Sequence, residues 1–258
     1  MNIIAVVSAK GGVGKTTFSA NLGTAISRVG LSVVAVDLDP QDSLRLHFGL
    51  PEQASAGLAG AALSGSDLRK TLRRADLGCE VLPFGRIDEE GRESFEQLLR
   101  DQPRWLLQNL SQLDLPEDAV VIIDTPPGPS VYLRQALQAA NFVLVVLLAD
   151  AASYATLPMM IRLIKKYCLG RPNFIDYSYL INQIDHSRQL VSDVAHVMRT
   201  QFGERSLATV HQDQAIPEAL ACNQFVRDYD PHSRGAHDLT AACAQLLACL
   251  PARNWTAT

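Results

Sequence analysis

Short, continuously apolar runs constrain the fold of this 258-residue chain more than any other feature. Within each run apolar and polar residues do not alternate, which is typical of strands buried on both faces of a parallel sheet. Stretches of helical character separate most of the runs, so we expect right-handed crossovers in an α/β, doubly wound and mostly parallel sheet flanked by helices. The predicted strands are 3–7, 32–36, 80–84, 119–123, 142–148 and 175–181, and the predicted helices are 16–29, 92–112, 131–140, 154–168, 187–201 and 235–249.

The repeated pattern predicts one domain over residues 1–250 and a flexible C-terminal tail over 251–258. The stretch 51–78, rich in alanine, glycine and serine, is expected to be an excursion above the sheet and not a second domain. Ligands of doubly wound sheets bind at the carboxyl ends of the strands. The residues that directly follow the apolar runs are therefore the candidates for a site.

Net charge, cysteine content and apolar runs bear on the partners and the cellular compartment that we expect for the chain. The net charge of -4 disfavours a broad nucleic-acid-binding surface. The five cysteines are odd in number and form no CxxC pair, which favours a reduced, cytoplasmic compartment. The start of the chain lacks the features of a signal peptide, and no apolar run approaches the roughly 20 residues of a membrane helix.

A glycine-rich loop joins the first predicted strand to the first predicted helix, in the segment AVVSAKGGVGKTT at 5–17. Glycines let the backbone approach an anion closely, and the helix N-terminus adds its positive dipole end. Lys15 is expected to meet the β- and γ-phosphates of a nucleotide, and the hydroxyl of Thr16 to ligate Mg²⁺. The strict pattern has glycine at position 9, where this chain has Ala9. The predicted nucleotide-binding residues here are Gly11, Gly12, Val13, Gly14, Lys15, Thr16 and Thr17.

Aspartates follow two further predicted strands. Asp37 and Asp39 end the run 32–36, and strand alternation directs both side chains to the same face. Asp124 follows the run 119–123 and is expected to bind Mg²⁺ through a water molecule. Together with the lysine, these groups suit phosphoryl transfer to water, in which positioning and charge neutralisation do most of the catalysis.

The motifs KGGVGKTT, DLDPQ and DTPPG, which begin at residues 10, 37 and 124, resemble those of the MinD/ParA family of P-loop ATPases, a branch of the SIMIBI class. The resemblance covers roughly residues 2–250. It implies an ATPase that forms a nucleotide-sandwich homodimer with ATP and Mg²⁺.

The same resemblance implies specific catalytic roles. Lys10 would reach across the two-fold interface to the nucleotide of the partner subunit, as an arginine finger does. Lys15 would serve its own nucleotide, and Asp39 would position or activate the attacking water. Asp37 would lie near the Mg²⁺ that Thr16 and Asp124 bind.

The segment YLINQIDHS at 179–187 bears on which base is read. Asn182 and Asp185 partly match the guanine-reading N-K-x-D pattern, but Gln183 replaces the lysine. The family resemblance implies instead that Asn182 reads adenine and that the backbone near Pro217 contacts the base. We therefore expect ATP, with GTP left open by Asp185.

Three longer stretches, at 150–158, 182–194 and 210–239, resemble the branch of the family that is encoded with bacterial cellulose synthases. This resemblance implies a cytoplasmic accessory factor of cellulose synthesis and secretion, acting with other cytoplasmic subunits of that machinery. Recruitment to the inner membrane or cell pole would occur through partners, because the chain's end lacks the basic amphipathic character of a membrane anchor.

Other functions are compatible with the same motifs. The principal alternative is a ParA-like ATPase in DNA partitioning or in the polar positioning of cargo. A metal-cluster-carrying ATPase would need suitably spaced cysteines, which the chain lacks. A scaffold that uses ATP only to dimerise is disfavoured by the presence of Asp39.

Overall fold

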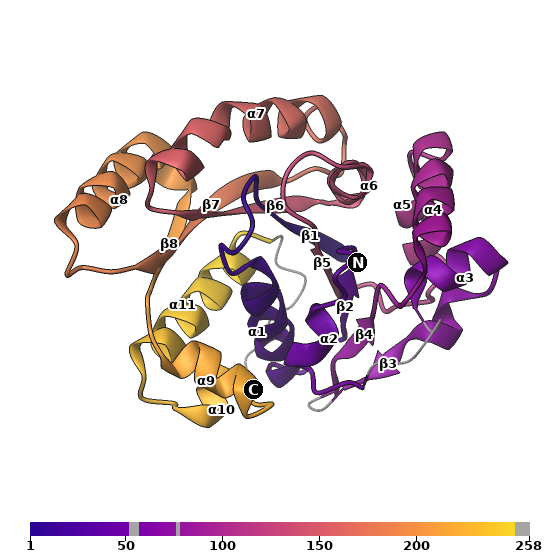
Figure 1. Ribbon diagram of the computed structural model, residues 1–258, viewed down its shortest axis with the longest axis horizontal. Helices are drawn as coiled ribbons and strands as arrows, with labels where there is room; N and C mark the ends of the chain where they lie inside the picture. Colours follow the sequence, from indigo (N-terminus) through magenta and orange to yellow (C-terminus); the bar gives the residue numbers. More distant parts are fainter. Residues whose placement is uncertain (52–56, 76–77, 251–258) are drawn as a thin grey trace.

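The computed structural model describes residues 1–51, 57–75 and 78–250. This part of the chain contains an eight-stranded sheet with the order β3-β4-β2-β5-β1-β6-β7-β8 (Figure 1). Neighbouring strands are parallel except β3 and β4, so the predicted doubly wound, mostly parallel α/β sheet is confirmed. The strands are β1 (Asn2–Val7), β2 (Val33–Asp37), β3 (Arg73–Arg74), β4 (Glu80–Leu82), β5 (Val120–Asp124), β6 (Phe142–Leu148), β7 (Asp176–Ile184) and β8 (Ser206–His211).

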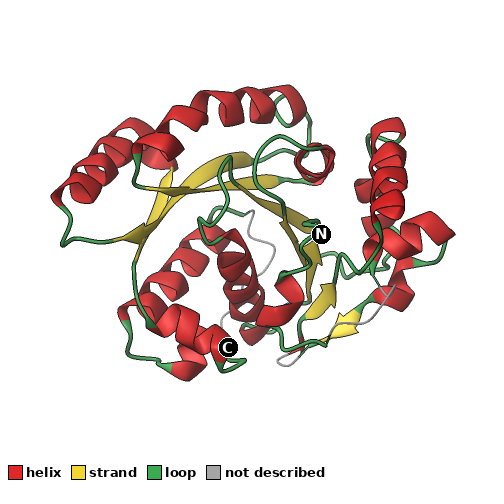
Figure 2. Cartoon of the chain, viewed as in Figure 1, coloured by secondary structure: helices red, strands yellow, loops and turns green. Residues whose placement is uncertain are grey.

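Helices cover both faces of the sheet, as Figure 2 shows. One core lies between the sheet and α1, α2 and α9–α11, and another lies between the sheet and α3–α7. Successive residues of β1 alternate between these cores, with Ile4 on the α1 side and Ala5 on the other. The helices are α1 (Lys15–Arg28), α2 (Leu44–His47), α3 (Leu58–Ser64), α4 (Glu89–Asp101), α5 (Trp105–Leu110), α6 (Val131–Ala139), α7 (Ala151–Tyr167), α8 (Gln189–Phe202), α9 (Ala215–Ala221), α10 (Val226–Tyr229) and α11 (Arg234–Ala248).

The structure differs from the prediction where the hydrophobic signal is weak or interrupted. The predicted helix 92–112 is two helices, α4 and α5, because Pro103 has no amide hydrogen and its ring disfavours a continuous helix. The excursion 51–78 contains α3 and also contributes β3, an antiparallel edge strand of two arginines that has no apolar run. The edge strand β8 is missing from the prediction, because only Val210 in it is fully buried.

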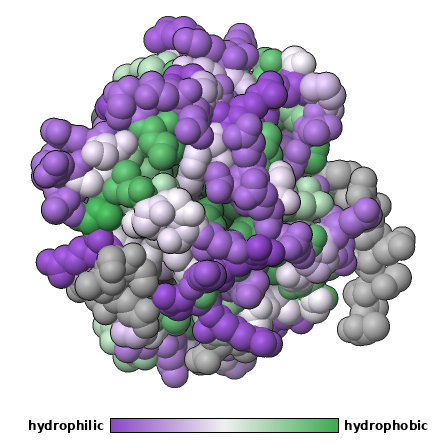
Figure 3. All heavy atoms as spheres, turned by 90° about the vertical axis from the view of Figure 1, so that its right-hand side faces the viewer, coloured by the Kyte–Doolittle hydropathy of each residue, from purple (hydrophilic) through white to green (hydrophobic). Residues whose placement is uncertain are grey.

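The surface of the described residues is mixed in hydropathy. Hydrophilic residues dominate the face that carries α3, α4 and α5, with apolar residues showing there in patches (Figure 3). Between residues 1 and 250, apart from the two short gaps, no helix combines the length and apolar character needed to cross a membrane. The predicted tail at 251–258 lies outside the described residues.

Candidate nucleotide-binding site

The loop between β1 and α1 has the backbone geometry that phosphate binding requires. Gly12 and Gly14 have φ values of 73° and 88°, in the left-handed region that glycine adopts without a steric penalty. Gly14 is the N-cap of α1 and has no side chain to cap the helix, so the first amides of α1 are open to an anion. A Cβ on Gly14 would also lie 2.3 Å from Nδ2 of Asn182, so a larger residue here would displace that side chain as well as strain the backbone.

Thr16 and Asp124 form a hydroxyl–carboxylate pair at the start of α1. Thr16 Oγ1 donates to Asp124 Oδ2 at 2.6 Å, and Ser19 Oγ donates to Asp124 Oδ1 at 3.2 Å. Burial raises the pKa of Asp124 to about 6, while the hydrogen bond from Thr16 and the charge of Lys15 oppose this rise. Hydroxyl and carboxylate oxygens are ligands that Mg²⁺ prefers, so these residues fit the predicted magnesium site.

Ser19 is a site residue that the sequence analysis missed. Thr16 and Ser19 are three residues apart on a helix and therefore share a face, so the helical spacing could have identified it.

Lys15 is a desolvated cation directed into the same region. Its residue is only 6% exposed, and burial lowers its pKa, while the charges of Asp124, Asp39 and Asp37 raise it. Its ammonium forms no salt bridge with any of the described residues. A buried ammonium without a direct counter-ion is suited to bind a phosphate.

Asp37 lies beside Asp124 but is engaged by its own loop. The two residues are register partners on β2 and β5. Asp37 Oδ1 accepts from the amide of Asp39 and Oδ2 from the amide of Leu44, both at 2.9 Å. Burial, followed by the charge of Asp124, raises the pKa of Asp37 well above its usual range. The structure thus shows Asp37 as the anchor of the loop that carries Asp39, and its role near Mg²⁺ stays a prediction.

The loop after β2 is tied to two parts of the molecule. Asp39 Oδ1 accepts from the amide of Gln41 at 3.0 Å, and its charge acts on Lys15. Asp42, which has a φ of 49°, accepts at Oδ1 from the amide of Phe84 at 2.9 Å. The sequence analysis did not single out Asp42, because its contact with the segment after β4 depends on the tertiary fold.

Lys10 is paired within its own chain. Its Nζ lies 2.7 Å from Oδ2 of Asp150, and the other oxygen of Asp150 accepts from the amide of Ser153 at the start of α7. The two paired side chains are 41% and 37% exposed, so the pair is a weak surface contact. The predicted contact of Lys10 with a partner's nucleotide requires this lysine to leave Asp150, and it stays a prediction.

An open cleft of about 270 Å³ adjoins the phosphate loop and brings the predicted base-side residues together. Thr17 and Asn182 line it from one side, and Pro217 lines it from the segment after β8. His211, which the sequence analysis missed, also lines the cleft, and its Nδ1 lies 2.6 Å from Oδ2 of Asp238. Nothing in the sequence indicated that His211 lies beside the cleft, because it is an isolated histidine in a polar segment.

The end of β7 uses its polar residues in two ways. Asn182 Nδ2 donates to the carbonyl of Val13 at 2.8 Å, so this side chain contacts the phosphate loop as well as the cleft. Asp185 is bound within its own turn, where Oδ1 accepts from the amide and the hydroxyl of Ser187 and Oδ2 pairs with Arg188. Asp185 is not among the residues that line the cleft.

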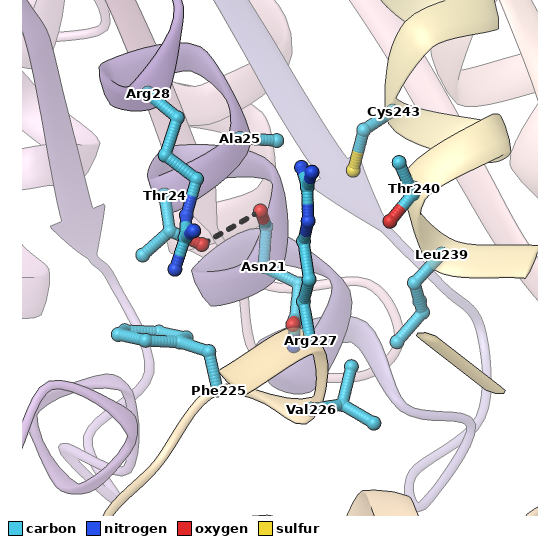
Figure 4. A pocket seen from close by; sticks show the side chains of 10 residues that line it. All are labelled: Asn21, Thr24, Ala25, Arg28, Phe225, Val226, Arg227, Leu239, Thr240 and Cys243. Atoms are coloured by element: carbon cyan, nitrogen blue, oxygen red, sulfur yellow. Dashed lines mark hydrogen bonds between the residues drawn. The ribbon is translucent and has the colours of Figure 1, made fainter. Parts of the chain in front are cut away.

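A second cavity lies behind α1, where α10 and α11 pack against it (Figure 4). Its volume is about 20 Å³, which suits a water molecule and not a nucleotide. Arg28 at the end of α1 donates to both carboxylate oxygens of Asp228 at 2.6 Å. This region therefore fastens the base-side helices to the helix that follows the phosphate loop.

Comparison with known proteins shows which family the whole chain resembles. The model of the protein family described as cellulose biosynthesis protein BcsQ matches residues 1–249. A cellulose biosynthesis protein BcsQ from Salmonella typhimurium is 25% identical over 247 residues, which cover 93% of this chain and 91% of the relative. The chromosome-partitioning ATPase Soj of Thermus thermophilus is 28% identical and covers 95% of both chains.

A solved structure shows the same fold. The septum site-determining protein MinD of Pyrococcus horikoshii, complexed with Mg-ADP, has a TM-score of 0.76 at 22% identity. The match covers 98% of this chain and 99% of that one. The predicted resemblance to the MinD/ParA family is therefore confirmed.

Proposed function

We propose a function from the premise that this chain belongs to the cellulose biosynthesis protein BcsQ family: it is an ATP-dependent, dimerising ATPase that acts as a cytoplasmic accessory factor of bacterial cellulose synthesis. The observation that carries the ATPase is the convergence of Lys15, Thr16 and Asp124 at the N-terminus of α1. Relatives that share most of the chain include a protein named for cellulose biosynthesis and an ATPase.

The residues divide the chemistry of ATP hydrolysis among them. Lys15 and the loop amides neutralise and hold the phosphates, and Thr16 and Asp124 hold Mg²⁺, which when bound offsets the charge that develops during phosphoryl transfer. Asp39 lies in a loop that is anchored by Asp37, which suits it to orient a water molecule. The protein therefore contributes mainly position and electrostatic stabilisation.

Adenine is the base that the cleft favours. A guanine-reading site needs a carboxylate facing the base, and both oxygens of Asp185 are engaged by Ser187 and Arg188. Asn182 lines the cleft with an amide that has both an acceptor and a second donor hydrogen, the pair that the amino edge of adenine requires.

Dimerisation would complete the site. Lys10 is half-exposed at the mouth of the phosphate loop and is held by Asp150 alone among the described acidic residues. In a nucleotide-sandwich dimer it would exchange Asp150 for the γ-phosphate of the partner's ATP. A charge-assisted contact with phosphate in a water-poor interface is stronger than a surface ion pair.

Light scattering after size exclusion tests this proposal in wild type, Asp39→Ala and Lys10→Ala, each with Mg-ATP and with Mg-ADP. Asp39→Ala should accumulate as an ATP-bound dimer, because hydrolysis normally dissolves that state. Lys10→Ala should bind ATP through Lys15 but remain mostly monomeric. If Lys10→Ala dimerises with ATP as well as Asp39→Ala does, the role of Lys10 across the interface is refuted.

The cellular partner distinguishes the two candidate biological roles. The family match supports cellulose synthesis, while the 28% identity to Soj supports a ParA-like partitioning ATPase. A pull-down from the native cytoplasm with ATP and with ADP should recover subunits of the cellulose machinery in a nucleotide-dependent manner. Salt-sensitive binding to nonspecific DNA would favour the partitioning role instead.

A further inference from the structure

Strand β7 is irregular where it passes the phosphate loop. Its register with β8 shifts between Ile181 and Ile184, and Gln183 within this stretch has a φ of 56°. In a regular strand the side chains of residues 182 and 183 would point to opposite faces. A left-handed backbone in a residue other than glycine is strained, and such strain and strand irregularities recur at functional sites.

The irregularity directs two consecutive amide side chains to the same loop. Asn182 Nδ2 donates to the carbonyl of Val13 at 2.8 Å, and Gln183 Nε2 donates to the carbonyl of Gly12 at 3.2 Å. The two donors thus bind two successive carbonyls of the phosphate loop.

Holding a carbonyl also fixes the amide of the next residue, because the peptide unit is planar and its C=O and N–H point in opposite directions. The carbonyls of Gly12 and Val13 face β7, so the amides of Val13 and Gly14 face away from it. Gly12 has no heavy atom near the place of a side chain and a φ of 73°, so its own conformational preference does little to fix these peptide planes.

We propose that Gln183 is a positioning residue of the phosphate loop, which together with Asn182 holds the loop amides in the orientation that binds phosphate. This inference rests on the proposed nucleotide site. Both residues line the cleft, but we assign base contact to Asn182 alone, because the amide of Gln183 donates to the carbonyl of Gly12. These two contacts should raise the affinity for the nucleotide by preorganisation, because the loop is already ordered before the nucleotide binds.

Gln183→Asn separates the side-chain contact from the backbone strain. Asparagine adopts the left-handed region more readily than glutamine, but its amide is one methylene shorter and would not reach Gly12. A purely structural role predicts unchanged ligand affinity with equal or higher stability. The positioning role predicts weaker phosphate binding by a protein that is no less stable.

The experiment measures binding of Mg-ATP and of inorganic tripolyphosphate with Mg²⁺ by calorimetry, together with the melting temperature without ligand. Gln183→Asn should reduce the affinity for both ligands by a similar factor of roughly three to ten, which corresponds to the free energy of one hydrogen bond. Gln183→Lys, which retains a donor of sufficient reach, should restore most of the affinity. Asn182→Ala should reduce the affinity for ATP more than the affinity for tripolyphosphate. Gln112→Asn, in an exposed turn, is the matched control.

Two results would overturn the inference while leaving the nucleotide site intact. One is wild-type affinity of Gln183→Asn for tripolyphosphate. The other is an equal loss in Gln183→Asn and Gln183→Lys, which would show that the donor is irrelevant. If the wild-type protein binds neither ligand, the proposed function fails and this inference fails with it.

Discussion

The phosphate end and the base end of the proposed site are built differently. Lys15, Asp37 and Asp124 at the phosphate end are almost fully buried on strand ends and on the first turn of a helix. At the base end, Gln214 and Pro217 are exposed beside an open cleft. The phosphate end therefore holds desolvated charges on rigid elements, whereas the base end relies on hydrogen bonds that water can replace. Substitutions should have large effects on binding and stability at the first end, and small, selective effects at the second.

The largest effect should follow from Lys15→Ala. The substitution removes the buried cation that faces the phosphates, so ATP affinity should fall by at least about a hundredfold. Calorimetry with Mg-ATP measures this change. Lys10→Ala is the matched control, because Lys10 is an exposed lysine of the same loop and should leave monomeric ATP binding almost intact. Unchanged affinity of Lys15→Ala would refute the assignment of the loop.

Asp124→Asn should separate stability from activity. Burial makes the carboxylate unfavourable in the nucleotide-free protein, so its neutral isostere should raise the free energy of unfolding at pH 7 by about 1 to 3 kcal/mol. The same change should abolish Mg²⁺-dependent hydrolysis. Urea unfolding and phosphate release measure the two quantities. A variant less stable than wild type would contradict the account of Asp124 as a desolvated charge.

The stability difference between wild type and Asp124→Asn should depend on pH in a defined direction. The pKa of Asp124 in the folded protein, about 6, lies above the ordinary value of 3.8. The folded protein therefore takes up a proton more readily as pH falls from 7 to 4, and the contribution of Asp124 to the free energy of unfolding rises over this window. The charge of Asp124 also raises the pKa of Asp37, so the difference between wild type and Asp124→Asn reports the titration of Asp124 together with its effect on Asp37. That difference should shrink as pH falls.

The phosphate end is also the part that the sequence predicts well. Its residues follow fully buried strands or open a helix, so continuous apolar runs and glycine spacing place Lys15, Thr16 and Asp124 at one edge of the sheet. Burial in the two cores determines where these strands lie, and the ends of the strands then determine where the site side chains lie.

The base end could not be predicted in the same way. The edge strand β8 has little buried apolar surface, and no local sequence pattern indicates the left-handed conformation of Gln183 or its contact with Gly12. The resemblance to a family indicated Asn182 and Pro217, but nothing local indicated that Asn182 also binds Val13. For the same reason the sequence left GTP open, because the side-chain partners of Asp185 become visible only in the folded turn.

Asn182→Ala tests whether base recognition is as modest as the open cleft suggests. Loss of its amide should reduce the preference for ATP over GTP by about tenfold or less, the range of one or two hydrogen bonds. Competition of each nucleotide against a fluorescent ATP analogue measures the preference. Equal competition by ATP and GTP in the wild type would remove the basis for assigning adenine.

The smallest effect should come from Asp185→Ala. Asp185 stands where a guanine-reading carboxylate would stand in the sequence, but its oxygens accept from Ser187 and pair with Arg188. Its removal should loosen that exposed turn and leave the ratio of ATP to GTP affinity unchanged within about twofold. The same competition assay measures the ratio, with Asp193→Ala on the exposed face of α8 as a matched loss of one carboxylate. A fall in GTP affinity specific to Asp185→Ala would mean that this carboxylate leaves its turn to meet guanine. The base end would then be a mobile reader, unlike the fixed phosphate end, and GTP would replace ATP as the proposed nucleotide.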